Sequence, residues 1–291
     1  MHRFVIIFGL VFWVWSCGEF EEPELAGDSW EEIEEAGHGA LTALYVPAEG
    51  FAYQNDEGRL TGVTVEIIQD FARFLAEEHD IVLQVDFVEE EDWSRFYEKI
   101  VEGEDGLIGF GNVTITEERR EELRFSPPYM TNIASLITHE DAGELEDFET
   151  MDETFAGLDA LAFEGTLHEE RLRHLIESYH PEAGLEMAHS NDEILDKLSE
   201  ANRYFAYIDL YNYWRAVDRG APLRRHEVGD EASEQFGYIM PLESSWGEIL
   251  TEYFEHSDGL LQSDRYREIM ETHLGESLAN LLIEANRDQV Q

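Results

Sequence analysis

After residue 38, two periodic patterns of hydrophobic and polar positions alternate along the chain. Apolar segments at 40–46, 81–88 and 107–110 are typical of buried strands, whereas the apolar positions of 63–77 and 93–102 recur with the spacing of an amphipathic helix. This β-α-β-α-β order predicts a mostly parallel sheet with helices on its faces.

A second α/β pattern follows the first. It predicts a strand at 160–163, helices at 166–178 and after Ser190, a strand at 204–209 and an aromatic helix at 211–217. Thr166 and Ser190 each precede a Glu by three positions, which is the spacing of a capping box. The sequence therefore predicts two similar α/β units in series.

Two further segments join these units, and a helical region ends the chain. Residues 135–139 are typical of a strand that leaves the first unit, and 235–240 of a strand that returns to it. Residues 246–273 have helical periodicity with a break at Ser263 and Asp264.

The amino terminus has the pattern of an export signal. An apolar run at 4–15 is shorter than the roughly 20 residues that a spanning helix needs. Residues 14–17 resemble a bacterial lipobox, although Trp15 is bulkier than that motif normally allows, and a cleavable signal with an incidental Cys is the alternative. We expect a lipoprotein signal peptide at 1–17, lipidation of Cys17 and an acidic, solvated tether at 18–37.

Composition narrows the possible partners. The chain has 66 acidic and 19 basic residues, a formal net charge of −47 and a single Cys. Disulfides therefore do not stabilise the fold, and nucleic acid is excluded as a partner because binding it needs basic contacts to phosphate. Adaptation to high salt is the economical explanation of the charge. A metal-buffering or nucleic-acid-mimicking surface is the rival, but the acids are spread along the whole chain.

The most informative stretch is 106–129, which reads GLIGFGNVTITEERREELRFSPPY. Ligands of α/β sheets bind beyond the carboxyl ends of strands, near the first turns of helices. If Thr116 caps the next helix, Arg119 lies in its first turn, where its guanidinium can fold back beside Thr114 and hold a carboxylate. The alternative is an ordinary helix start with an Arg that faces water.

With these motifs the chain resembles the family 3 extracellular solute-binding proteins, two-lobed proteins that capture amino acids for ABC importers. The likeness spans about 38–275 and rests on pieces in the family order: 51–53, 58–62, 114–116 with Arg119, 125–129, 165–166, the strand ending at Asp209, and 266–269. It implies a type II periplasmic-binding-protein-like α/β fold, in which two parallel-core sheets flanked by helices are joined by two crossover strands. Lobe 1 would comprise 38–138 and 235–291, and lobe 2 would comprise 139–234.

The resemblance also implies roles for single residues. Arg119 would bind the α-carboxylate of the ligand with help from Thr114, Asn112 and Thr166. Asp209 would take the α-ammonium, and Trp93 and Phe51 would complete the ligand-binding set, with Trp93 covering the apolar part of the ligand. Other roles stay open: Thr166 and Asp209 as helix caps, Trp93 as core, and Asn112 and Thr114 as turn residues.

Three positions depart from the family pattern. Ala48 stands where an aromatic residue is frequent, Tyr45 where an acid is usual, and Leu167 where a second small hydroxyl is common. These changes remove polar and stacking partners near the ligand side chain. We therefore expect a solute that differs from the usual polar amino acids.

The function implied is a lipid-anchored binding protein at the outer face or in the periplasm, which delivers a small zwitterion to an ABC permease. Its lobes would close by hinge motion near residues 138 and 234. We expect a monomer with no cofactor, no metal, no nucleic acid partner and no enzymatic activity. A periplasmic enzyme on the same fold, such as a dehydratase, and a ligand-sensing lipoprotein are the alternatives, although the sequence has no HExxH or G-x-S-x-G motif.

Overall fold

A computed structural model describes residues 25–257 and 259–289. The expected signal peptide with Cys17, and the first part of the expected tether, lie outside the described residues.

The first α/β unit, called lobe 1 below, has the predicted order. Its parallel strands β1 (His38–Tyr45), β4 (Val82–Glu89) and β5 (Leu107–Thr114) lie in the order β4-β1-β5, with α2 (Val63–Glu78) and α3 (Trp93–Val101) as the connecting helices. A short hairpin of β2 (Tyr53–Gln54) and β3 (Leu60–Thr61) precedes α2. The period of the apolar positions thus located these strands and helices at nearly their observed bounds.

The second unit, lobe 2, also follows the prediction. Strands β8 (Asp159–Phe163), β9 (Leu185–Ala188) and β10 (Tyr204–Asp209) are parallel, and α5 (Leu167–Tyr179), α6 (Asn191–Glu200) and α7 (Leu210–Asp218) flank them. The Ser190 hydroxyl accepts from the Glu193 N–H at 3.1 Å, so the predicted cap of α6 is confirmed. The strand β9 and the short η2 (Phe148–Thr150) and α4 (Met151–Thr154) had no sequence prediction.

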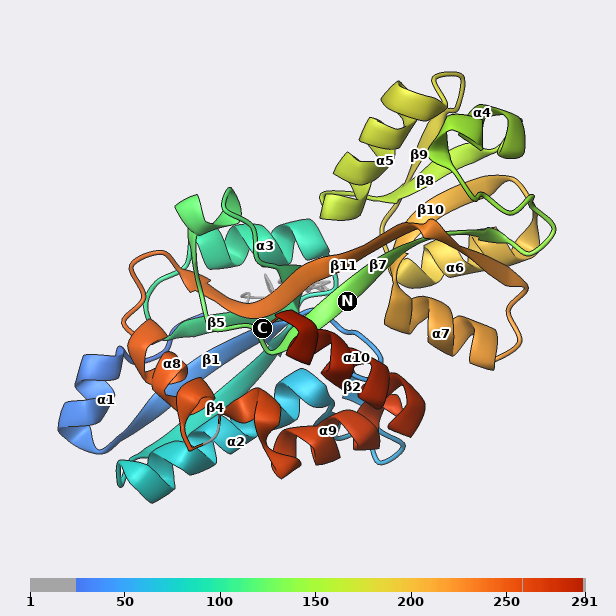
Figure 1. Cartoon of the computed structure of the whole chain (residues 1–291). Coiled ribbons are helices and arrows are strands. Elements are labelled where there is room, and N and C mark those ends of the chain that lie inside the picture. The colour runs from blue at the N-terminus through green and yellow to red at the C-terminus, as the bar shows by residue number, and fades with distance from the viewer. Residues whose placement is uncertain (1–24, 258, 290–291) are drawn as a thin grey trace, which may run out of the picture.

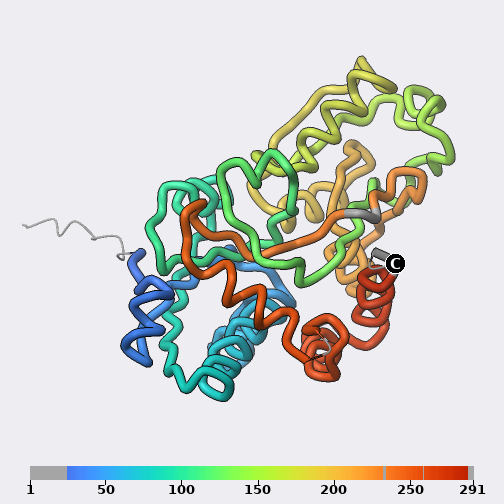
Figure 2. The backbone as a smooth tube through the Cα atoms, turned by 60° about the vertical axis from the view of Figure 1, so that its left-hand side comes forward, coloured from blue at the N-terminus to red at the C-terminus, as the bar shows by residue number. Residues whose placement is uncertain are grey.

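Two long antiparallel strands join the lobes. Strands β7 (Met130–His139) and β11 (Leu223–Pro241) run side by side from one lobe to the other (Figures 1 and 2). Both begin well before the predicted segments, and they merge the two parallel groups into one nine-stranded sheet within the described residues. The pairing of β11 with β7 shifts register between His226 and Glu234. Beside Met130, Phe236 also pairs with Thr114 of β5, which places the crossing next to the end of that strand.

The remaining helices pack on lobe 1. They are α8 (Gly247–Glu255), η3 (Leu260–Gln262), α9 (Asp264–Leu274) and α10 (Glu276–Gln289). The Ser263 hydroxyl caps α9 by accepting from the Tyr266 N–H at 3.0 Å, so the predicted break is confirmed. Helix α10 packs along β7 and has no counterpart in the sequence prediction.

Part of the predicted tether is folded. Residues Trp30–Ala36 form α1, whose first turn is closed by a capping box between Ser29 and Glu32. Ile33 is fully buried, and Trp30 packs against Trp246 with ring centroids 5.7 Å apart. A solvated tether is therefore wrong for this helix, because its amphipathic turn buries apolar surface despite the acidic composition.

The segment before α1 is also attached to lobe 1. The Thr42 hydroxyl donates to the Ala26 carbonyl at 2.6 Å, and the Asp28 N–H donates to the Ala40 carbonyl at 2.8 Å. The Trp246 indole N–H donates to the Asp28 carbonyl at 3.1 Å.

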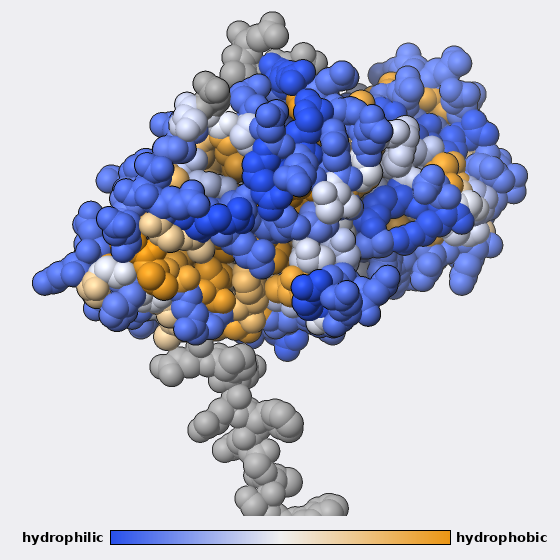
Figure 3. Space-filling view, turned by 90° about the horizontal axis from the view of Figure 1, so that it is seen from below, coloured by the Kyte–Doolittle hydropathy of each residue, from blue (hydrophilic) through white to orange (hydrophobic). Residues whose placement is uncertain are grey.

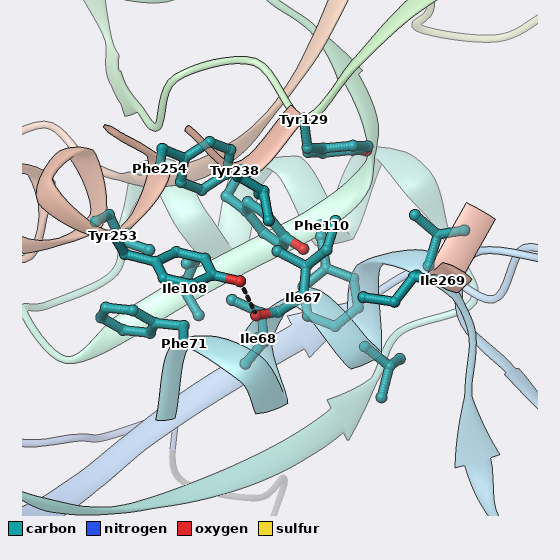
Figure 4. Close-up of a cluster of buried hydrophobic side chains, with 14 of the residues drawn as sticks. Ile67, Ile68, Phe71, Ile108, Phe110, Tyr129, Tyr238, Tyr253, Phe254 and Ile269 are labelled. Carbon is teal, nitrogen blue, oxygen red and sulfur yellow. Dashed lines mark hydrogen bonds between the residues drawn. The ribbon is translucent and has the colours of Figure 1, made fainter. Parts of the chain in front are cut away.

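Each lobe has its own buried core. The largest cluster lies in lobe 1, where side chains of α2, β5, β11 and α8 interlock, among them Phe71, Phe110, Tyr238 and Tyr253 (Figure 4). The Tyr253 hydroxyl donates to the Ile67 carbonyl at 3.3 Å, so this polar atom is satisfied inside the core. The face of the molecule in Figure 3 is mostly hydrophilic and carries one broad hydrophobic patch.

Candidate functional site

A cavity of about 210 Å³ lies between the two lobes. Its walls come from the carboxyl ends of β5, β8 and β10 and from the first turns of α3, α5, α6 and α7. Most of the predicted site residues line it: Trp93, Asn112, Thr114, Arg119, Thr166 and Asp209.

Arg119 lies on a single 3₁₀ turn. The expected helix after Thr116 is replaced by η1 (Arg119–Glu121), because β6 (Leu123–Phe125) starts directly afterwards to pair with β11. The Thr116 hydroxyl still accepts from the Arg119 N–H at 3.2 Å. The Arg119 guanidinium folds back as predicted and donates from Nη1 to the Thr114 carbonyl at 3.0 Å.

The surroundings of Arg119 leave its charge unpaired. The guanidinium carbon lies 5.4 Å from the ring centroid of Trp93 and 5.6 Å from that of Tyr97. Burial lowers the pKa of Arg119, whereas Tyr97 and Glu170 favour its charged form. Among the described residues, no carboxylate lies within ion-pair distance of it, so most of its five N–H donors are free for an anion.

Asp209 lies on the other wall of the cavity, in lobe 2. It is the N-cap residue of α7, but its side chain makes no capping hydrogen bond, so the alternative role as a helix cap is wrong. Asp209 Oδ1 accepts from Asn132 Nδ2 at 2.6 Å and lies 3.1 Å from His168 Nε2. The carboxylate is buried and aimed at the cavity and the crossover strands rather than at its own helix.

A ring of polar side chains, all of them buried except Arg171, ties Asp209 to the crossover strands. Arg171 forms an ion pair with Glu234 of β11, and its Nη1 lies 3.3 Å from His168 Nδ1. Asn132 of β7 closes the ring by donating to Glu234 Oε2 at 3.1 Å. Sequence reasoning missed these partners. The spacing of His168 and Arg171 places them on one face of α5, but nothing local in the sequence indicates that Glu234 lies opposite.

Of the predicted residues, Asn112 lines the cavity with its side chain already engaged, and Phe51 does not line it. Both ends of the Asn112 amide are engaged: Nδ2 donates to the Tyr211 hydroxyl at 2.7 Å, and Oδ1 accepts from the Tyr129 hydroxyl at 2.9 Å. Its side chain therefore bridges the lobes, which leaves only its backbone for a ligand. Phe51 is buried behind Tyr211, with ring centroids 4.6 Å apart, and does not line the cavity. A large apolar ring gains more from full burial than from a place in a polar wall.

The remaining candidates lie on the cavity wall. The Thr166 hydroxyl donates to the Phe163 carbonyl at 2.8 Å and does not cap α5. The predicted capping box is also absent there, because Glu169 accepts from the Gly165 N–H instead. Trp93 is half-buried and stacks on Tyr97 at 5.3 Å, so it is not a core residue. Thr114 is buried at the end of β5.

Within residues 25–257 and 259–289, no group of three or more His, Cys, Asp or Glu is placed to hold a metal ion. None of the helices in these ranges has both the length and the apolar character needed to span a bilayer.

Solved structures with the same fold come from amino-acid-binding proteins. An ancestral arginine-binding protein bound to glutamine has 17% identity and a TM-score of 0.64, covering 81% of this chain and 98% of its own. A substrate-binding protein of an ABC uptake transporter from Streptococcus pneumoniae, with bound histidine, has 19% identity and a TM-score of 0.65, covering 85% and 96%. The arginine-, lysine-, histidine-binding protein of Geobacillus stearothermophilus has 16% identity and a TM-score of 0.63, covering 81% and 96%.

These likenesses show a shared fold, the type II periplasmic-binding-protein fold. A comparison with curated protein sequences found no match. The sequence profile of the bacterial extracellular solute-binding proteins, family 3, matches residues 42–276, which is most of the chain. The chain therefore belongs to the bacterial extracellular solute-binding proteins of family 3.

Proposed function

We propose that this protein binds a small amino-acid-like zwitterion and delivers it to an ABC permease. The observation that carries this proposal is that Arg119 of lobe 1 and Asp209 of lobe 2 line one cavity. A guanidinium without a carboxylate partner and a buried carboxylate complement a molecule that has an anion at one end and a cation at the other.

The charge of the buried ring favours an ammonium group beside Asp209. Asp209 and Glu234 contribute two carboxylates, whereas Arg171 supplies one guanidinium. When His168 is neutral, one negative charge is left for the ligand to balance. A buried charge without a partner is costly, so an ammonium group is the appropriate occupant.

Contacts across the cavity mouth support closure of the lobes around the ligand. Glu49, in the loop after β1, forms ion pairs with Arg215 of α7 and with Arg219 directly after that helix. The Asn112 bridge to Tyr211 makes a second link. In our proposal the lobes, divided at 138/139 and 234/235, open by bending β7 and β11 where their register shifts, which breaks these links and releases the solute.

The remaining parts of the proposal concern location and partners. The family is extracellular, and a protein tethered through a lipidated Cys17 would stay next to a permease in the membrane. The protein would act as a monomer with no cofactor, metal or nucleic acid partner, and it would not transform its ligand.

The test is isothermal titration calorimetry with the amino acids in molar KCl, on the wild type and on two neighbouring variants. Arg119→Gln removes two charge-assisted hydrogen bonds of about 1.5–3 kcal/mol each, so affinity should fall about 10²- to 10⁴-fold. Arg120→Gln is the matched control, because Arg120 is exposed, lies against Phe125 and is outside the cavity. It should bind like the wild type.

Equal affinity of the two variants would refute the role of Arg119. Failure of the wild type to bind any amino acid would refute the proposed function, and turnover of a bound compound would favour the enzyme instead.

A further inference from the structure

Part of the cavity wall is apolar. Six apolar side chains line this part of the wall, five of them aliphatic and one aromatic. They come from the loop after β1 and from four elements of lobe 2. These residues are Val46 and Ala48 of lobe 1 and Phe163, Leu167, Leu195 and Ala216 of lobe 2. All six are half-buried, so each has a face left to cover.

Several polar side chains of the cavity wall already have partners inside the protein. Glu49 is held by two arginines, the Thr166 hydroxyl by the Phe163 carbonyl, and the Asn112 amide by two tyrosines. Among the described cavity residues, three buried polar atoms lack a partner: Asn191 Oδ1, Asn212 Nδ2 and Arg215 Nη1. All three are enclosed by protein atoms and do not open onto the cavity.

Apart from Asp209, the described cavity residues include no buried acid that could receive a basic side chain. The Tyr45 hydroxyl turns away from the cavity and donates to Glu89 at 2.7 Å. Glu91 and Asp192 line the cavity only as exposed residues at its rim, so Asp209 is the one buried carboxylate among its described residues.

We propose that the ligand is an amino acid with an apolar, aliphatic side chain. This inference rests on the proposed function, because it assumes that Arg119 and Asp209 hold the two charged ends. The ligand side chain then lies between Val46 and Ala48 on one side and Phe163, Leu195 and Ala216 on the other. A ligand with a guanidinium, amide or carboxylate side chain would lose its water there without gaining a partner.

The first experiment is calorimetric titration in molar KCl with alanine, 2-aminobutyrate, norvaline, leucine, glutamine, glutamate, lysine and arginine. Each buried methylene should tighten binding roughly three- to fourfold, so leucine should bind about 50-fold more tightly than alanine. Tighter binding of any of the four polar amino acids than of leucine would overturn this inference and leave the proposed function standing. Binding of no amino acid at all would overturn both.

The second experiment fills the apolar space from α7. Ala216→Leu should weaken leucine binding at least tenfold and leave alanine binding within threefold of the wild type, because only the longer side chain meets the added carbons. Val217→Leu is the control on the same helix, since Val217 is exposed and outside the cavity. Equal loss of leucine and alanine affinity in Ala216→Leu, or no loss of either, would show that the ligand side chain does not lie against α7.

Discussion

Breaking the ion pair of Arg171 and Glu234 should destabilise the protein strongly. The Glu234 side chain is only 3% exposed, whereas that of Arg171 is 18% exposed. Arg171→Gln would leave the carboxylate facing the Asn132 amide without a cation. Removing one partner of a buried pair costs about 3–5 kcal/mol, and we expect the lower end, about 3 kcal/mol, because Arg171 retains some contact with water.

Urea unfolding at constant high salt measures this cost. Glu234→Gln should lower the free energy of unfolding less than Arg171→Gln does. The reason is that the Arg171 guanidinium is more exposed to water than the Glu234 carboxylate. The double variant should cost less than the sum of the single variants by more than about 1 kcal/mol. Arg173→Gln is the matched control on α5, since it breaks an exposed pair with Glu169 worth about 0–1 kcal/mol.

An Arg171→Gln variant within about 1 kcal/mol of the wild type would refute the reasoning. So would a cost that disappears in molar KCl, because salt screens exposed pairs much more than buried ones.

Three further predictions concern ligand affinity, acid and salt. Asp209→Asn keeps the shape of the side chain but removes its charge, so amino-acid affinity should fall about 10- to 100-fold in calorimetry; unchanged affinity would exclude an ammonium at this position. Burial lowers the pKa of His226 to about 4, and the positive charge of Arg224 makes a smaller contribution in the same direction. The unfolded chain therefore binds more protons than the folded chain between about pH 4 and 6.5, and stability should fall by about 2–3 kcal/mol as the pH is lowered from about 7 to 4.5. Urea midpoints of His226→Gln should show a smaller fall, and an equal fall would exclude His226 as a cause. With a formal net charge of −47, the thermal midpoint should rise from low salt to several molar KCl, and a flat response would remove the high-salt hypothesis.

The fold was predictable where its signals are local. The strands and helices of both lobes follow from the period of their apolar residues, which depends only on neighbouring positions. Helix α1 also has a local signal, the Ser29–Glu32 capping box, but the acidic composition around it outweighed that signal. Helix α10 could have been found from the buried positions Leu278, Leu282 and Asn286, which recur every four residues.

Only the part of the site that the family motifs cover was predictable from the sequence. The order of the segments predicted the places of Arg119, Thr114, Thr166 and Asp209 around one cavity. The ring that holds Asp209 depends on pairings across the lobes, such as that of Arg171 with Glu234, and no local pattern specifies them. The 3₁₀ turn at Arg119 was missed because it is set by the pairing of β6 with β11.

If the lobes open and close as proposed, the attachment of residues 26–28 to β1 and Trp246 determines which lobe moves. Four hydrogen bonds fasten this segment to lobe 1 before the first helix begins. Whatever holds the chain upstream of residue 25 therefore holds lobe 1 as a stationary base. In that proposal, lobe 2, connected through β7 and β11, is the half that moves, so a partner that senses closure would have to contact lobe 2.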